Sequence, residues 1–254
     1  MSVSSILCSI PVETPGGTLR RPRSEGPVPI MPKIAITSIN HWTEKNGYPK
    51  CKFYDIDMLY PNDDEIEKFF KENDADIVGL SAVVSTSYLQ VQRIAKIIRN
   101  VNSKILIVCG GYLTAAANTV LRKTDVDVCV VGDGEVAWVG LLNYVRKNKN
   151  RNKKIYTDEI LEIKGIALVD ENSELRFSGY GPTLSSCHMS FPSFDYLKSG
   201  LNGDDKAVYN YFRPYNASEE FLMDDRSYEK DRRPMVSSIH VSKGCVAKCT
   251  FCQR

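Results

Sequence analysis

Three short apolar runs near the middle of the chain determine the fold: DIVGLSA (76–82), KILIVCGG (104–111) and DVCVVGDG (127–134). Each is rich in Val, Ile or Leu, and the last two end in glycines. Near-continuous apolar runs of this length are typical of parallel strands that are covered on both faces. Two further runs, KIAITSI (33–39) and CKFYDIDM (51–58), precede them. We therefore predict a doubly wound α/β fold with a parallel five-stranded sheet.

The segments between these runs have the features of helices. One begins at Pro61, where acidic residues stand at the positive end of a helix dipole. Another begins at Thr86 or Ser87, whose hydroxyl can cap it, and its apolar residues recur at helical spacing. Two more are predicted over about 113–123 and 135–147.

The chain divides into four predicted parts. Residues 1–32 form a disordered leader, because the segment 11–32 holds six prolines and three glycines without apolar periodicity. The α/β domain covers 33–147. A connector follows over 148–234, in which two apolar runs joined by Asp-Glu-Asn-Ser predict a β-hairpin. Residues 235–254 begin a further domain.

The composition excludes several classes of protein. The 254 residues include 33 Lys and Arg against 31 Asp and Glu, a net charge of +2, which favours neither a nucleic-acid nor a membrane-surface role. No apolar run approaches the roughly 18 residues of a spanning helix. The basic run 146–154 is interpreted as a solvated helix end, with an RNA contact as the alternative. Eight cysteines over this length are too few for a disulfide scaffold.

In a doubly wound sheet, ligands bind at the carboxyl ends of the strands. Here those ends read Ser38–His41, Ser81–Ser87, Gly110–Thr114 and Gly132–Glu135. Glycines let the backbone approach a ligand, and hydroxyl groups offer hydrogen-bond donors. Taken singly, these glycines are equally explained as chain turns, and no GxGxxG or phosphate-loop pattern is present.

The strongest chemical signal is the segment MVSSIHVSKGCVAKCTFCQR (235–254). A predicted strand leads into a loop that gathers Cys245, Cys249 and Cys252 within eight residues. Structural zinc takes four protein ligands, whereas three thiolates suit a 4Fe–4S cluster that keeps one iron open. The alternative is zinc, with a fourth ligand from among His240, Cys187 and His188.

Residues 244–252, GCVAKCTFC, resemble the signature of the radical S-adenosylmethionine (SAM) family. In that family the three cysteines hold a 4Fe–4S cluster whose fourth iron binds the methionine part of SAM. Phe251 matches the aromatic residue that usually precedes the third cysteine. The resemblance implies reductive cleavage of SAM to a 5′-deoxyadenosyl radical, with an electron donor such as flavodoxin or ferredoxin as partner.

The upstream domain resembles the cobalamin (B12)-binding domain of one radical SAM subclass. The matching stretches are DIVGLSAVVSTSY (76–88), IVCGGYLTA (107–115) and DVCVVGDGE (127–135). The resemblance implies that three loops contact cobalamin. The implied contacts are Ser81, Ser85, Thr86 and Ser87 near the cobalamin tail, and Gly110, Gly111, Thr114, Gly132, Asp133, Gly134 and Glu135 along its nucleotide and corrin edge.

The chain departs from this pattern in three ways. It lacks the Asp-x-His-x-x-Gly motif whose histidine ligates cobalt in many cobalamin proteins, which leaves His41 as a possible ligand. The segment 40–50 between the first two predicted strands is short for a crossover, so we expect the first helix to be short or absent. The sequence stops two residues after Cys252, so it holds only the first strand of a radical SAM barrel and is expected to be an inactive fragment.

The leading hypothesis is the N-terminal part of a cobalamin-dependent radical SAM enzyme, most simply a methyltransferase acting on an unactivated carbon of a small-molecule or unknown substrate. Radical ring formation is the alternative chemistry. A tRNA methylthiotransferase would need a second cysteine triplet, and Cys51, Cys109 and Cys129 stand in predicted strands. The third possibility is a cobalamin-binding module without catalysis. Clusters and free thiols imply the cytoplasm, and we expect no nucleic-acid or membrane partner.

Overall fold

The computed structural model describes residues 3–12, 32–149, 155–185, 188, 193–202, 204 and 207–212. Its strands are β1 (Ser5–Ser9), β2 (Lys52–Asp55), β3 (Ile77–Ser81), β4 (Leu106–Gly110), β5 (Val128–Val130), β6 (Ile166–Val169) and β7 (Leu175–Phe177). Its helices are α1 (Ile34–Lys45), α2 (Ile56–Leu59), α3 (Asp63–Glu72), α4 (Tyr88–Val101), α5 (Ala117–Lys123), α6 (Gly134–Asn148), α7 (Thr157–Ile160) and α8 (Phe194–Ser199).

The strands form one sheet in the order β2-β1-β3-β4-β5-β6-β7. Strands β1 to β5 are parallel, and β6 and β7 continue the sheet as antiparallel strands. The order 2-1-3-4-5 is that of a flavodoxin-like doubly wound fold, so the predicted fold class is confirmed. The predicted β-hairpin is also confirmed as β6 and β7, although it joins the sheet instead of standing in a separate connector.

The first strand of the sheet was predicted in the wrong place. Residues 5–9 form β1, all five of them buried, and lie between β2 and β3, so the prediction of a disordered leader over 1–32 is wrong for this segment. That prediction extended the Pro- and Gly-rich composition of 11–32 to the short apolar run before it. Residues 13–31 lie outside the described part of the chain.

The run 33–39 belongs to a helix, not a strand. Helix α1 buries Ile36, Asn40 and Thr43, which recur at helical spacing, and a short apolar run alone does not distinguish the two structures. Because α1 lies in the crossover from β1 to β2, the expectation of a short or absent first helix is also wrong.

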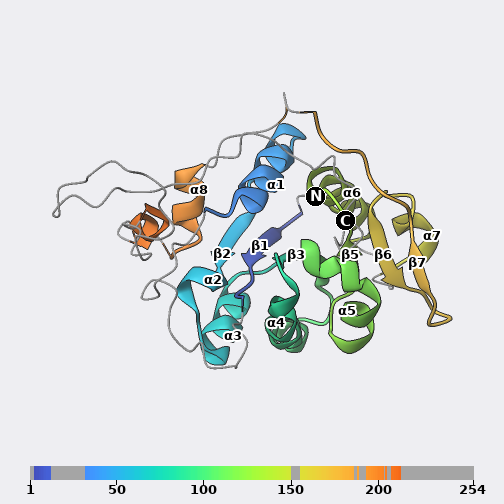
Figure 1. Ribbon diagram of the computed structural model, residues 1–254, viewed down its shortest axis with the longest axis horizontal. Helices are drawn as coiled ribbons and strands as arrows, with labels where there is room; N and C mark the ends of the chain where they lie inside the picture. Colours follow the sequence, from blue (N-terminus) through green and yellow to red (C-terminus); the bar gives the residue numbers. More distant parts are fainter. Residues whose placement is uncertain are drawn as a thin grey trace, which may run out of the picture.

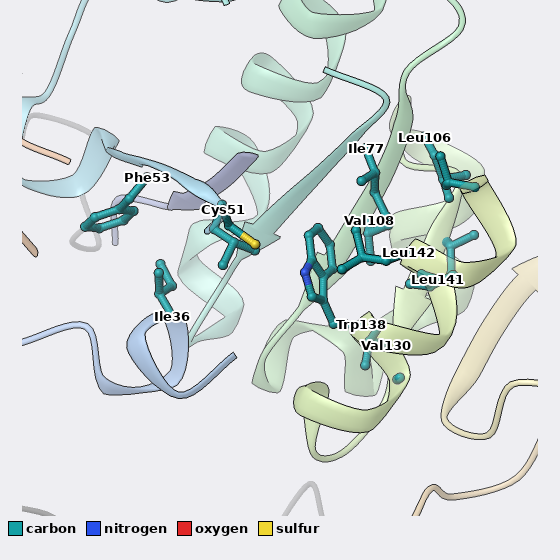
Figure 2. Close-up of a cluster of buried hydrophobic side chains, with 14 of the residues drawn as sticks. Ile36, Cys51, Phe53, Ile77, Leu106, Val108, Val130, Trp138, Leu141 and Leu142 are labelled. Atoms are coloured by element: carbon teal, nitrogen blue, oxygen red, sulfur yellow. The ribbon is translucent and has the colours of Figure 1, made fainter. Parts of the chain in front are cut away.

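Helices cover both faces of the sheet (Figure 1). Helices α1 and α6 lie on one face, and α3, α4 and α5 lie on the other. Alternate residues of β1 serve the two cores: Leu7 packs on the side of α1 and α6, whereas Ile6 and Cys8 pack on the opposite side. Trp138 of α6 lies in the first core against the strands (Figure 2).

The region that begins at Pro61 shows how local signals set a helix. Asn62 accepts a hydrogen bond from the backbone N–H of Glu65, and the Glu65 carboxylate accepts one from the Asn62 backbone N–H. This capping box satisfies two orphan donors and begins α3 at Asp63. Among the described residues, no helix is both long enough and apolar enough to span a membrane.

Because β1 is a central strand, truncating its core residue should weaken the whole domain. Leu7 is 3% exposed, and Leu7→Ala should lower the free energy of unfolding by about 2–5 kcal/mol. The control Leu175→Ala, at a 43% exposed position, should change it by about 0.5 kcal/mol or less. Urea unfolding followed by circular dichroism measures both. Equal, small effects of the two substitutions would contradict the placement of β1.

Candidate functional site

The carboxyl ends of four parallel strands are level with one another. Asp55 of β2 is in register with Ser9 of β1, Ser9 with Ser81 of β3, and Ser81 with Gly110 of β4. These four residues form a row, which we call the edge row. Since the sheet order reverses at β1 and β3, this edge is where a doubly wound fold binds its ligand.

The loop after β3 exposes apolar and hydroxyl-bearing side chains together. Val83 is 51% exposed and Val84 37% exposed, and Ser85 and Thr86 are also exposed. Ser87 stands at the N-cap of α4 and is fully buried, but its hydroxyl makes no capping bond. Its Oγ has no hydrogen-bond partner among the described residues.

Gly110, the last residue of β4, and Gly111, which follows it, have different surroundings. A Cβ on Gly110 would meet nothing within 4 Å, so the backbone there faces open space. Gly111 has φ +91°, and a Cβ on it would collide with the Ala82 carbonyl oxygen. The two loops are joined closely, because the Ala82 N–H donates to the Gly110 carbonyl at 2.9 Å and the Leu113 N–H donates to the Ala82 carbonyl at 3.3 Å. The second glycine is therefore required by the fold itself.

Thr114 lies at the base of the same loop. Its side chain is buried, and its hydroxyl donates to the Gly111 carbonyl at 2.7 Å. The Thr114 hydroxyl thus stabilises the loop, and its proton is engaged in this hydrogen bond. Tyr112, in contrast, is 68% exposed beside the glycines.

The loop after β5 leads directly into α6. Gly132 is exposed with φ +95°, Asp133 is half-buried, and Gly134 begins the helix. The buried Glu135 carboxylate accepts a hydrogen bond of 2.7 Å from the Ser38 hydroxyl of α1. A Cβ on Gly134 would lie 3.1 Å from the Ile39 side chain. Small residues here allow α1 and α6 to approach each other at the edge.

Large exposed apolar side chains gather at this edge. Val83, Val84, Leu89 and Tyr112 all belong to the loops or the first turn after β3 and β4. Tyr180 is 66% exposed and packs edge-on against Phe177, and its ring lies 3.9 Å from a Cβ built on Gly132. Exposed apolar residues on neighbouring loops are typical of surfaces that bind a ligand or partner.

The sequence-derived candidates from three loops therefore meet at one edge. Of the predicted strand end Ser38–His41, Ser38 reaches the edge from helix α1, whereas His41 is exposed on that helix. Ser9 and Asp55 were not predicted as site residues, because the strand of Ser9 was not predicted and the strand of Asp55 was expected to continue to residue 58. It also missed Tyr180, which no sequence pattern connects to Gly132.

The cysteine motif lies outside the described residues, as do Phe251 and the zinc alternatives Cys187 and His240. The motif residues are Cys245, Cys249 and Cys252. His188 is described, and its Nδ1 lies 3.2 Å from the Lys45 ammonium, with its ring edge-on to Trp42.

The described cysteines do not form a second triplet. Cys51 lies in the core beside α1, whereas Cys109 and Cys129 lie in the core on the other face of the sheet. Burial raises the pKa of Cys51, and a hydrogen bond with the Cys109 thiol together with burial raises the pKa of Cys129. Such thiols are protonated at neutral pH and are poor metal ligands. Within the described ranges, no group of three His, Cys, Asp or Glu residues is arranged to hold a metal ion.

Because Gly110 and Gly111 have different surroundings, their substitution by alanine should change the free energy of unfolding by different amounts. Gly111→Ala should lower the free energy of unfolding by more than about 1 kcal/mol, because it combines a strained φ with a collision at Ala82. The matched control Gly110→Ala should change it by about 0.5 kcal/mol or less, since the new methyl group enters open space. Thermal and urea unfolding measure both values. The opposite ranking would contradict the described loop geometry.

Residues 28–142 match the model of the B12 binding domain family. The match begins after β1 and ends within α6, so it includes all three loops of the edge.

Two curated relatives are methyltransferases. The chain is 24% identical over 195 residues to cytidylyl-2-hydroxyethylphosphonate methyltransferase of Streptomyces wedmorensis, covering 75% of this chain and 35% of the relative. It is 26% identical over 193 residues to an uncharacterised methyltransferase of Pyrococcus horikoshii, covering 74% and 33%. The chain thus spans about a third of the length of these relatives.

Solved structures share the fold. The cobalamin-dependent SAM radical enzyme OxsB with aqua-cobalamin bound has a TM-score of 0.60 at 16% identity, over 80% of this chain and 25% of that one. The radical SAM methyltransferase TsrM from Kitasatospora setae, with cobalamin and a 4Fe–4S cluster bound, has a TM-score of 0.52 at 15% identity, over 68% and 30%. Residues 28–142 are therefore similar to the B12 binding domain family, and the fold is similar to that of cobalamin-dependent radical SAM enzymes.

Proposed function

We propose that this chain binds cobalamin at the loops that follow β3, β4 and β5 and is the N-terminal part of a cobalamin-dependent radical SAM methyltransferase. One observation carries the proposal: the open backbone at Gly110 lies beside a group of exposed apolar side chains, at the binding edge of a domain that matches the B12-binding family. Cobalamin, when bound, supplies a cobalt centre that can carry a methyl group for transfer.

The residues at the edge fit the chemistry of this group. A corrin is a broad ring with apolar faces and amide side chains on its rim, so it needs both apolar contacts and hydrogen-bonding groups. Val83, Val84 and Tyr112 offer the apolar contacts. The exposed Ser85 and Thr86 offer hydroxyl groups, and the buried Ser87 hydroxyl has no partner among the described residues.

The roles of the remaining candidates follow from their contacts. Gly110 and Gly132 let a flat ligand approach the backbone, because neither carries a side chain into the edge. Thr114 stabilises its loop through the hydrogen bond from its hydroxyl to the Gly111 carbonyl. Glu135 joins α6 to α1 through the hydrogen bond that it accepts from Ser38. We therefore expect Thr114 and Glu135 to influence cobalamin through loop shape rather than by direct contact.

We further propose that Cys245, Cys249 and Cys252 hold a 4Fe–4S cluster, and that Phe251 lies beside SAM bound to it. The donor set fits a cluster with one open iron, since three thiolates leave one coordination position free. The described cysteines are all buried inside the domain, away from the cysteine motif in the sequence. The two methyltransferase relatives support methyl transfer as the reaction, to an unactivated carbon of an unidentified substrate.

A tRNA methylthiotransferase is less well supported, because Cys51 lies in the core on the opposite face of the sheet from Cys109 and Cys129. A cobalamin module without catalysis differs from the proposed enzyme in one measurable property, the uptake of iron. Radical ring formation differs only in the product.

Reconstitution with hydroxocobalamin tests the cofactor. Residues 1–254 should retain about one corrin per chain after gel filtration, read by its visible absorbance. A chain trimmed to 33–254 should retain none, because it lacks β1. Gly110→Leu should weaken binding by about tenfold or more by filling the open space, while Gly110→Ala should retain most of it. Failure of the full chain to retain corrin would contradict the proposal.

Iron uptake tests the cluster. Anaerobic reconstitution should load about four iron and four sulfide per chain. Cys249→Ala should reduce both to near zero. The matched control Cys129→Ala should not change iron per folded chain, since Cys129 lies in the core. Loss of iron in the control alone, or retention in Cys249→Ala, would contradict the assignment.

A further inference from the structure

A buried polar cluster lies at the carboxyl ends of β1 and β2. Asp55 is fully buried, and its carboxyl group accepts hydrogen bonds from the Ser9 hydroxyl, the Met58 N–H at 3.0 Å and the Tyr211 hydroxyl. Tyr211 lies 156 residues further along the chain. Because a buried carboxyl group is costly without partners, these three donors hold the surrounding segments together. We call Ser9, Asp55 and Tyr211 the Asp55 cluster.

Tyr211 belongs to a segment that covers the outer edge of the sheet. Strand β2 is the edge strand there, and its Asp55 N–H donates to the Gly200 carbonyl at 2.9 Å. The Tyr196 ring packs on Phe53, with ring centroids 5.5 Å apart. Gly200 has no room for a Cβ, which would collide with the Phe53 ring. We call the described residues between 193 and 212 the docking segment.

The cluster also fixes the beginning of α1. The Lys33 ammonium pairs with the buried Asp57 carboxylate, and the Asp57 N–H donates to the Ser9 hydroxyl at 3.2 Å. Burial and the neighbouring Asp55 raise the pKa of Tyr211, so its hydroxyl keeps its proton and remains a donor. Ser9 therefore links Asp57 of α2 to Asp55 by hydrogen bonds, and Asp55 is linked in turn to Tyr211 of the docking segment.

The cluster is continuous with the candidate cobalamin site. Ser9 is in register with Asp55 on one side and with Ser81 on the other, and Ser81 with Gly110. The docking segment and the loops of the edge are therefore attached to one row of a hydrogen-bonded sheet. A contiguous packed element of this kind can transmit the order of one site to another.

We propose that Asp55 is a positioning residue, which couples the packing of the docking segment against β2 to cobalamin binding at the loops that follow β3, β4 and β5. This inference rests on the proposed cobalamin function. Coupling between two sites is reciprocal: if docking favours cobalamin, then cobalamin must favour docking by the same factor. If the Asp55 contacts only stabilised the docking segment, cobalamin binding would not change how firmly that segment docks.

Tyr211→Phe tests the coupling, since it removes one hydrogen bond to Asp55 and keeps the ring. The matched control is Tyr48→Phe, which removes a 2.6 Å hydrogen bond to Asn143 away from the cluster. Two quantities are measured on residues 1–254: the Kd for hydroxocobalamin by absorbance titration, and the rate of trypsin cleavage after Lys198, a half-buried residue of α8. Mass spectrometry identifies the cut.

We expect Tyr211→Phe to raise the Kd about fivefold and to speed the cut after Lys198. Hydroxocobalamin should slow this cut in the wild-type chain and have less effect in Tyr211→Phe, while Tyr48→Phe should behave as wild type. An unchanged Kd in Tyr211→Phe, with normal binding by the wild type, would overturn the coupling and leave the proposed function intact.

Two other outcomes are decisive. If the wild type binds no corrin, the proposed function fails and the coupling fails with it. If Tyr211→Phe does not fold, as judged by circular dichroism, the wild-type cleavage rate decides alone. Slower cleavage with hydroxocobalamin would support the coupling, and an unchanged rate would overturn it.

Discussion

The structure depends on the pairing of β1 with two parallel neighbours. Strand β1 is only five residues long, yet it joins β2 on one side to β3 on the other and contributes alternate side chains to both cores. Its register places Ser9 level with Asp55 and Ser81. The same pairing therefore builds the sheet, closes its outer edge through Asp55 and aligns the ends of the strands from which the ligand site is made.

The chemistry of the edge follows from that alignment. Because β3 and β4 end level with each other, the Ala82 and Gly111 backbones come into contact, and only glycine fits at position 111. The neighbouring Gly110 then faces open space, and Tyr112 is directed outward. Gly111 is thus required by the fold, whereas Gly110 is available to the proposed ligand. A similar division separates Thr114, whose hydroxyl holds the loop, from the exposed Ser85 and Thr86.

Much of this site could be predicted from sequence, because β3, β4 and β5 are apolar runs that end in small residues. The first strand could not, since SILCS directly precedes a Pro-rich segment, and the composition of that segment predicts disorder. KIAITSI was predicted as a strand because its helical face, Ile36, Asn40 and Thr43, extends beyond the apolar run. The contact between Asp55 and Tyr211 has no local signal, since it joins residues 156 apart.

Hydrogen exchange of residues 1–254, with and without hydroxocobalamin, can locate the cobalamin site. If cobalamin binds at the loops that follow β3, β4 and β5, exchange should be slower in peptides that cover 81–88, 110–116 and 131–135, with little change in α3 at Asp63–Glu72. Slower exchange confined to α3 or to the amino ends of the strands, with the three loops unaffected, would contradict it.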